Sequence, residues 1–383
     1  MHLVFATSDF VISGHPYPGF PILLRDNMEG CAPVNQFFRF YLLRGPIGSK
    51  KSWANTGQAL YDYFSFLQAH ELAWDDVDRG EDKTLVAAYR DYCFDVAELA
   101  RNTVRNRLLY VCAFYEFALR QTWIGNLPFG FEERRAPRAP ALLAHVDARG
   151  GKTSVRDVMP RAHKDIPKFL SSEQAKALLQ AATNPHHRMI IRFALGTGLR
   201  REELATFPLA LVVAPDSADR QARNIRVSLS PRDGHGMKTK GSKPRDIYIS
   251  RRLMEDLRHY AVHVRGERAC LSAREQKALF LNQEGEPFSA DGKSLDRIVR
   301  LIGQKAGVRV WTHMLRHTYA THTLVSLQRS RDRNRIEPLA FLQQQLGHAS
   351  INTTMVYLHL VNELADDAVL AYDDELNNWA EEC

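Results

Sequence analysis

The chain has 383 residues, of which 45% are apolar and 25% are charged, a composition typical of soluble globular proteins and long enough for two domains. No apolar run reaches the ~18 residues of a membrane span, and the first ten residues lack the basic and apolar regions of a signal peptide. We therefore expect a cytoplasmic protein. The five cysteines are scattered without metal-type spacing, which predicts reduced thiols and no zinc site.

Charge is distributed unevenly along the chain. Eight of the 44 acidic residues lie in 362–383, which has no Lys or Arg. Residues 1–361 contain the other 36 acidic residues and all 51 Lys and Arg, so they carry a net charge of +15. A basic body with an acidic tail favours a polyanionic partner for the body, although charge alone is also compatible with a soluble protein that is simply basic.

The first 130 residues indicate an arm followed by a helical domain. Residues 1–30 carry several Gly and Pro between short apolar pieces, which predicts an irregular N-terminal arm. Apolar residues then recur at helical spacing over 31–130, with helices expected near 83–94 and 102–121. About four helices rich in aromatic residues are expected, and we interpret the aromatic side chains as core.

Residues 131–167 change character, with several Pro and Gly and an excess of basic residues. This composition predicts a basic linker between two domains. Two interpretations remain open: the linker follows a phosphate backbone across a groove, or it is a solvated connector.

The second domain is expected to begin at Lys168. Ser171 or Ser172 is a suitable cap for its first helix. A later helix runs into Gly196 and Gly198, which permit a sharp turn before a new helix starts. On that new helix Arg200 and Glu203 are one turn apart, so the carboxylate can hold the guanidinium in place.

Residues 224–250 predict two strands joined by a turn rich in Gly and Lys. Apolar residues alternate in both segments, at Ile225 and Val227 and again at Ile247 and Ile249. The turn carries three lysines, Lys238, Lys240 and Lys243. Further helices are expected near 251–264, 290–306 and 312–326.

Polar residues of the last two helical segments share faces. His313 and Arg316 are spaced i, i+3, whereas His317 and His322 are interpreted as structural. Gly347 suits the left-handed position that closes a helix, and Ser350 can cap the next one. This arrangement would hold His348 and Tyr357 at a fixed separation, facing a common space.

These motifs together resemble those of one family, the tyrosine site-specific recombinases or phage integrases. The residues that carry the resemblance are Gly198-Leu199-Arg200 with Glu203, Lys240-Gly241-Ser242-Lys243, His313-x-x-Arg316, Leu346-Gly347-His348 and Tyr357, nine residues after His348. The resemblance implies a two-domain clamp on DNA. A helical core-binding domain at 31–130 would join a catalytic domain at 168–383, and the fold would be mainly α with a small antiparallel β-hairpin.

The resemblance also implies the chemistry. Tyr357 would attack a DNA phosphodiester, and Arg200 and Arg316 would hold the non-bridging oxygens as negative charge develops. His313 and His348 would donate further hydrogen bonds or take the proton from Tyr357, which needs help because free tyrosine ionises near pH ~10.

Lys240 is the expected general acid for the leaving 5′ oxygen, with Lys238 and Lys243 as rivals because the interval after Arg200 is long. Lys238, Lys243 and Arg245 are expected DNA contacts. The product would be a 3′-phosphotyrosyl bond, which preserves the energy of the phosphoester without ATP. We expect no cofactor and no metal.

The expected partner is double-stranded DNA, bound by a homotetramer on two sites, with or without other recombinases or accessory proteins, in the bacterial nucleoid. An apolar stripe from Leu360 to Trp379 indicates a C-terminal helix that docks in cis or in trans. A basic insert at 329–335 has no assigned role. The task would be integration, excision or transposition of a mobile element; the alternatives are a type IB topoisomerase and a non-catalytic DNA-binding relative.

Overall fold

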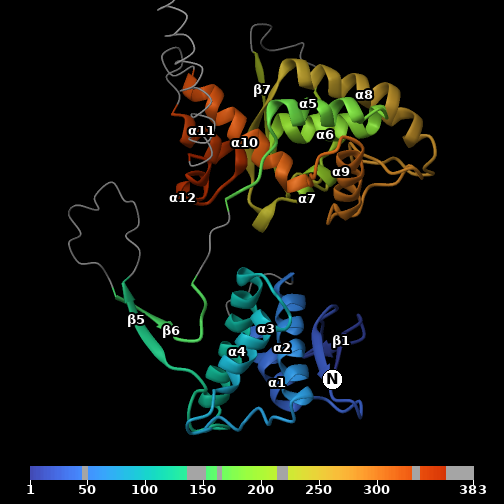
Figure 1. Ribbon diagram of the computed structural model, residues 1–383. Helices are drawn as coiled ribbons and strands as arrows, with labels where there is room; N and C mark the ends of the chain where they lie inside the picture. Colours follow the sequence, from blue (N-terminus) through green and yellow to red (C-terminus); the bar gives the residue numbers. More distant parts are fainter. Residues whose placement is uncertain (45–50, 136–151, 162–165, 214–222, 330–336, 359–383) are drawn as a thin grey trace, which may run out of the picture. The chain divides into compact units, whose positions relative to one another are not determined.

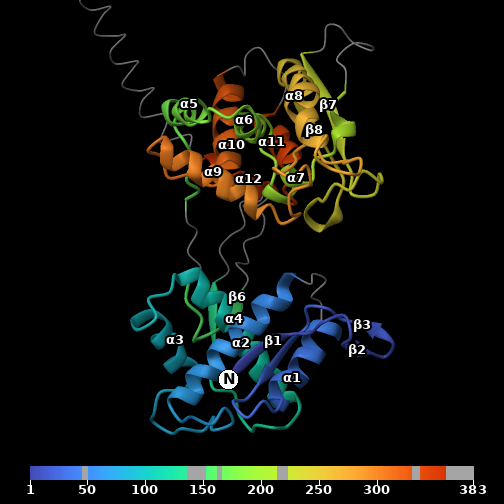
Figure 2. The same ribbon diagram turned by 90° about the vertical axis from the view of Figure 1, so that its right-hand side faces the viewer.

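The computed structural model describes residues 1–44, 51–135, 152–161, 166–213, 223–329 and 337–358 (Figures 1 and 2). The chain divides into two compact units, unit 1 at Met1–Lys164 and unit 2 at Asp165–Cys383. The division lies three residues before the start that we predicted for the second domain. Each unit has its own hydrophobic core.

Unit 1 is built on a group of helices with an aromatic core. Its helices are α1 (Ala32–Phe38), which continues as the π-helical η1 (Arg39–Arg44), α2 (Lys51–Ala69), α3 (Leu85–Asp95) and α4 (Arg101–Arg120). Thr84 caps α3 by accepting a hydrogen bond from the Ala87 amide. Phe37, Tyr63 and Phe114 are fully buried. The predicted helical domain and the assignment of its aromatic residues to the core are confirmed.

The prediction of an irregular arm at 1–30 is wrong. Strand β1 (His2–Phe5) pairs with β4 (Pro21–Leu24), and β2 (Val11–Ile12) pairs with β3 (His15–Pro16), both antiparallel. Figure 2 shows β1 beside the helices of unit 1. Asn35 of α1 bonds the Leu23 amide and carbonyl, each at 2.9 Å, and Leu23 is fully buried. These long-range contacts order the segment, and local Gly and Pro content does not reveal them.

The predicted linker at 131–167 is also partly wrong. Strands β5 (Phe131–Arg135) and β6 (Lys152–Arg156) form an antiparallel pair. Val158 and Met159 are buried in the core of unit 1, and Arg156 donates to Glu116 of α4 at 2.7 Å. Burial of these two apolar side chains attaches the segment to unit 1.

Unit 2 packs its helices around α10, which contacts α6 on one side and α11 on the other (Figures 1 and 2). Its helices are α5 (Ser172–Ala181), α6 (Pro185–Thr197), α7 (Arg201–Ala205), the 3₁₀ turn η2 (Leu209–Leu211), α8 (Arg251–Ala269), α9 (Lys293–Lys305), α10 (Thr312–Arg329), α11 (Pro338–Leu346) and α12 (Ile351–Thr354). Ser171 caps α5 through a capping box with Gln174, one of the two caps that we predicted.

The predicted hairpin is confirmed. Strand β7 (Asn224–Leu229) pairs antiparallel with β8 (Arg245–Ser250), and Val227 lies opposite Ile247. Val227, Ile247 and Ile249 are buried and Ile225 is half-buried, and the two strands pack against α6 and α8. The connection contains a 3₁₀ turn, η3 (Lys240–Ser242). The fold is thus mainly α with small antiparallel sheets, as expected.

Two predicted features lie outside the described residues: most of the basic insert at 329–335 and the C-terminal helix from Leu360 to Trp379. Within the described part of the chain, no helix is long and apolar enough to cross a membrane.

Candidate active site

Arg200 is placed by the turn that closes α6. Gly198 ends this helix at φ +64°, and a Cβ there would lie 2.4 Å from the ring of Tyr319, so glycine is required. The chain then extends at Arg200 and starts α7. The Arg200 Nη1 donates to the Glu203 Oε1 at 3.1 Å, and its Nη2 donates to the Gly347 carbonyl at 3.1 Å.

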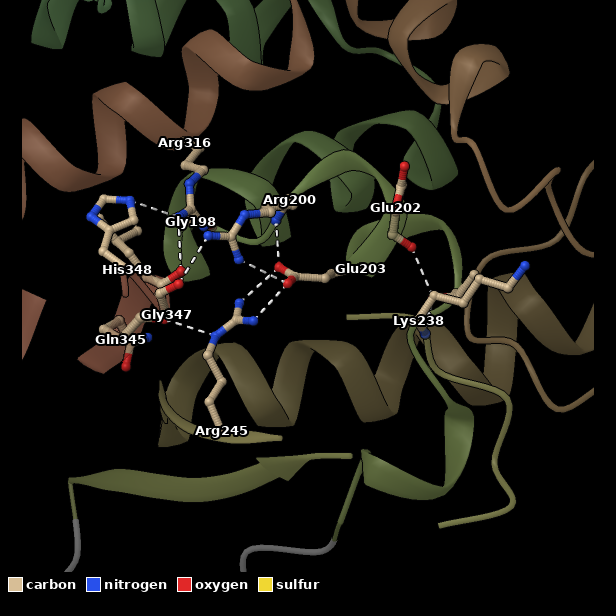
Figure 3. Close-up of polar contacts among 12 residues, drawn as sticks. Gly198, Arg200, Glu202, Glu203, Lys238, Arg245, Arg316, Gln345, Gly347 and His348 are labelled. Atoms are coloured by element: carbon tan, nitrogen blue, oxygen red, sulfur yellow. Dashed lines mark hydrogen bonds and ion pairs between the residues drawn. The ribbon is translucent and has the colours of Figure 1, made fainter. Parts of the chain in front are cut away.

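Glu203 is fully buried and lies between two arginines (Figure 3). Arg245 of β8 donates to both carboxylate oxygens, at 2.6 and 2.7 Å. Burial opposes ionisation of this carboxyl, but the hydrogen bonds and charge of Arg245, together with those of Arg200, lower the pKa of Glu203 to about 2. The carboxylate therefore stays ionised and fixes the Arg200 side chain.

Arg245 differs from its predicted role as a DNA contact. Its guanidinium faces the interior, its side chain is only 10% exposed, and its bonds go to Glu203 and to the Gln345 carbonyl of α11. Hairpin position alone suggested a groove contact. The buried carboxylate, 42 residues earlier in the chain, is what directs the side chain inward.

Arg316 is buried at the junction of two helix ends. Its Nη1 donates to the Gly198 carbonyl at 2.7 Å, and its Nη2 donates to the Leu346 carbonyl at 2.8 Å. Both carbonyls belong to helix C-termini, where unpaired acceptors and the helix dipole favour a cation. Burial, and then the charge of Arg200, lower the pKa of Arg316 to about 9.

The charges of this cluster do not balance. Arg200, Arg245 and Arg316 bring three guanidinium groups together, whereas Glu203 is the carboxylate among the residues drawn that bonds two of them, Arg200 and Arg245 (Figure 3). Like charges in a partly buried site repel unless an anion joins them. The geometry therefore suits a bound phosphate or other oxyanion, which arginine forks bind bidentately.

His348 follows directly on the end of α11. Gly347 closes this helix at φ +65°, and Ser350 caps α12 by accepting from the Asn352 amide, both as predicted. The His348 Nε2 lies 3.1 Å from the Arg316 Nη2, and its Nδ1 lies 2.9 Å from the Thr354 Oγ1. Burial and then the charges of Arg316 and Arg200 lower the pKa of His348 to about 3, so this ring is neutral.

Tyr357 is buried, with 3% of its surface exposed. Its Oη lies 2.9 Å from the Nδ1 of His317 on α10, and its ring stacks against His348 with 6.3 Å between centroids. Burial raises the pKa of Tyr357, whereas Arg316 and Arg200 act in the opposite direction. We predicted His317 to be structural, and this contact was missed. The available signal was the i, i+4 spacing of His313 and His317 on one helix face.

His313 and the lysines complete the surroundings of the site. The His313 ring lies edge to face with that of His317, at 4.5 Å between centroids. Removal from water, then Arg316, Arg200 and Lys240, lower the pKa of His313, so the charge of Lys240 reaches the cluster. Lys238, by contrast, directs its ammonium group away from the arginines (Figure 3). Lys240 and Lys243 are both exposed on the connection between β7 and β8.

The sequence pattern of the phage integrase family matches residues 168–363, just over half of the chain. The chain therefore belongs to this family. Tyrosine recombinase XerC of Bacillus subtilis is 25% identical over 301 residues, which cover 75% of this chain and 81% of that protein. Tyrosine recombinase XerA of Pyrococcus horikoshii is 26% identical over 283 residues, covering 70% and 87%.

Solved structures share the fold. XerH site-specific recombinase bound to a palindromic difH substrate, in a post-cleavage complex, superposes with a TM-score of 0.55 at 18% identity, covering 83% of this chain and 79% of that one. The integrase of transposon Tn1549, in complex with transposon right end DNA, superposes with a TM-score of 0.54 at 18% identity, covering 85% and 94%.

Proposed function

We propose that this protein is a site-specific DNA recombinase that cleaves and rejoins double-stranded DNA through a 3′-phosphotyrosyl intermediate on Tyr357. The observation that carries the proposal is the convergence of separate segments on one place. Arg200 and Arg316 both bond the end of α11, Arg316 bonds His348, and His348 stacks on Tyr357. Family membership and the Xer recombinases among the relatives support the same activity.

In this proposal the arginines bind the scissile phosphate. Arg316 uses three of its five N–H donors on partners among the described residues, so it retains donors for the non-bridging oxygens. Arg200 contributes the second fork, with its orientation fixed by Glu203. Each well-placed donor to the developing charge is worth about 3–4 kcal/mol at the transition state.

Lys240 is proposed as the general acid for the 5′ oxygen. Its support is the effect of its charge on His313, and Lys238 and Lys243 are proposed as DNA contacts. A 5′-phosphorothiolate substrate tests the assignment, because a thiolate leaves without a proton. This substrate should restore cleavage to Lys240→Ala, whereas Lys238→Ala and Lys243→Ala should lose DNA affinity with little change in the rate of the bound complex.

A covalent trap tests the function as a whole. A duplex selected for binding from a randomised pool, then nicked next to the cleavage point, should leave the protein attached to DNA, and Tyr357→Phe should abolish the adduct. Tyr248→Phe is the control, since this tyrosine of β8 stacks on Phe341, outside the cluster. An adduct that survives Tyr357→Phe would exclude this nucleophile. Failure of the wild-type protein to form any adduct would favour a non-catalytic DNA binder.

We further propose a homotetramer on two DNA sites that serves a mobile element. Exchange of strands between two labelled duplexes separates this activity from that of a type IB topoisomerase, which would relax supercoils without exchange. Sequencing of genomic DNA attached to the trapped protein distinguishes the ends of a mobile element from a chromosomal resolution site, and light scattering of the DNA complex tests the tetramer.

A further inference from the structure

Two histidines contact Tyr357, and they present different atoms to it. His317 places its Nδ1 2.9 Å from the phenolic oxygen, which is hydrogen-bond distance. His348 instead stacks its ring nearly parallel to that of the tyrosine, with 9° between the planes. Of the two, only His317 has a ring nitrogen in hydrogen-bond contact with the nucleophilic oxygen within the described residues.

The hydrogen bonds of His348 exclude it as a proton acceptor in this arrangement. A guanidinium can only donate, so the contact of His348 Nε2 with Arg316 uses the lone pair of that nitrogen. A neutral imidazole has one lone pair available and one N–H. The Nδ1 of His348 therefore carries the proton and donates to the Thr354 Oγ1.

His313 contacts His317 and lies near the cationic groups of the site. Its ring meets the ring of His317 edge to face, and burial, then the charges of Arg316, Arg200 and Lys240, lower its pKa. This position suits a donor to the phosphate. His317, one turn further along α10, lies between His313 and the phenol of Tyr357.

We infer that His317, a residue first interpreted as structural, is the general base that takes the phenolic proton of Tyr357 during cleavage. The inference rests on the proposed function, in which Tyr357 is the nucleophile. The Oη–H bond breaks as Nδ1 accepts the proton, the phenolic oxygen forms its bond to phosphorus, and the bond from phosphorus to the 5′ oxygen breaks. Lys240 supplies the proton to that oxygen. On rejoining, the imidazolium of His317 returns its proton to the departing phenolate.

The neighbours of His317 keep its ring neutral. His313 and Arg316 lie on the same helix, and Tyr357 and His348 reach it from the segment after α11. Burial, then His313 and Arg316, lower the pKa of His317 to about 3, so the ring is neutral in the free protein. A phosphodiester bound at Arg316 would add negative charge near His317 and raise the proton affinity of its ring during cleavage.

His317→Asn is the informative variant, because its amide oxygen can accept the phenolic hydrogen bond but cannot take the proton. Cleavage of the selected nicked duplex should slow by about 10²-fold or more at neutral pH. The rate should then rise about tenfold per pH unit, as ionisation of Tyr357 by hydroxide replaces the base. The phosphorothiolate substrate should restore cleavage to Lys240→Ala but not to His317→Asn. His322→Asn is the control, since this histidine of the same helix bonds the Leu170 carbonyl instead.

A second measurement needs no DNA. Long-range ¹H–¹⁵N spectra of the full chain report the tautomer of each histidine, and His317 should carry its proton on Nε2, with a change at Nδ1 in Tyr357→Phe. A proton on Nδ1 would overturn the inference. So would a pH profile of His317→Asn parallel to that of the wild type. Cleavage that persists in Tyr357→Phe would instead refute the proposed function, so the two failures are distinguishable.

Discussion

The contact between Arg245 and Glu203 makes the strongest prediction about how the site is held. Arg245→Met removes both hydrogen bonds from the hairpin and leaves a buried carboxylate with Arg200 as its remaining cationic partner. Breaking a buried pair by removing one partner destabilises a protein by about 3–5 kcal/mol. Arg245 is slightly exposed, so we expect a loss near the lower limit, measured as the free energy of unfolding of the full chain in urea.

The cleavage rate should fall with stability, because Arg245 helps to hold the Glu203 carboxylate that orients Arg200. Arg226→Met is the matched control. Arg226 pairs with Asp246 across the same two strands, but its side chain is 67% exposed. An exposed pair contributes about 0–1 kcal/mol, so this variant should stay close to the wild type in unfolding and in cleavage.

The double variant Glu203→Leu with Arg245→Met separates the two effects. Replacing a buried ion pair by apolar side chains is often neutral or stabilising, so unfolding should recover most of the loss. Cleavage should not recover, since Glu203→Leu also removes the carboxylate that orients Arg200. A double variant that regains wild-type cleavage would refute the argument that the carboxylate positions Arg200.

Three further predictions concern the same cluster. Gly347→Ala should destabilise the protein by more than the ~1–2 kcal/mol of left-handed strain, because the new Cβ would lie 2.6 Å from the Arg245 Cδ. Gly241→Ala is the control in thermal unfolding. Gly241 has φ +68° and open space around it, so this variant should show the strain alone. The pKa of Glu203 falls from 4.5 to about 2 on folding, so its carboxylate stabilises the fold by about 3 kcal/mol above pH 4.5 and loses this contribution as the pH falls toward 2. Glu203→Gln should therefore flatten the dependence of the unfolding free energy on pH between 4.5 and 2. Thr354→Val should lower the free energy of unfolding by about 1–3 kcal/mol, because the His348 N–H loses its acceptor, and it should also slow cleavage. Thr321→Val is the control. The buried Thr321 hydroxyl has no partner among the described residues, so this variant should change urea unfolding little.

Local patterns account for the predictions that succeeded. The apolar alternation of β7 and β8, the Ser171 cap, the glycine closures at 198 and 347 and the helical spacing of unit 1 each depend on a few neighbouring residues. Such signals act through backbone dihedrals and short-range hydrogen bonds. They can therefore be recognised in the sequence without knowledge of the tertiary structure.

Prediction from local composition fails for residues 1–30 and 131–167. Their Gly, Pro and charge content is that of loops, but Leu23, Val158 and Met159 are buried in the core of unit 1. Packing against distant helices overrides the weak strand propensity of these segments.

The sequence by itself determined the mainly helical class, the hairpin and the set of residue types from which a phosphoryl-transfer site can be built. Only the tertiary structure decided how these side chains are used. It turned Arg245 inward to Glu203, occupied the lone pair of His348 with Arg316, and brought His317 to the phenol of Tyr357. The physical reason is that a hydrogen bond between residues 30 or more positions apart depends on the packing of α7, β8, α10 and α11 together, which no local pattern encodes.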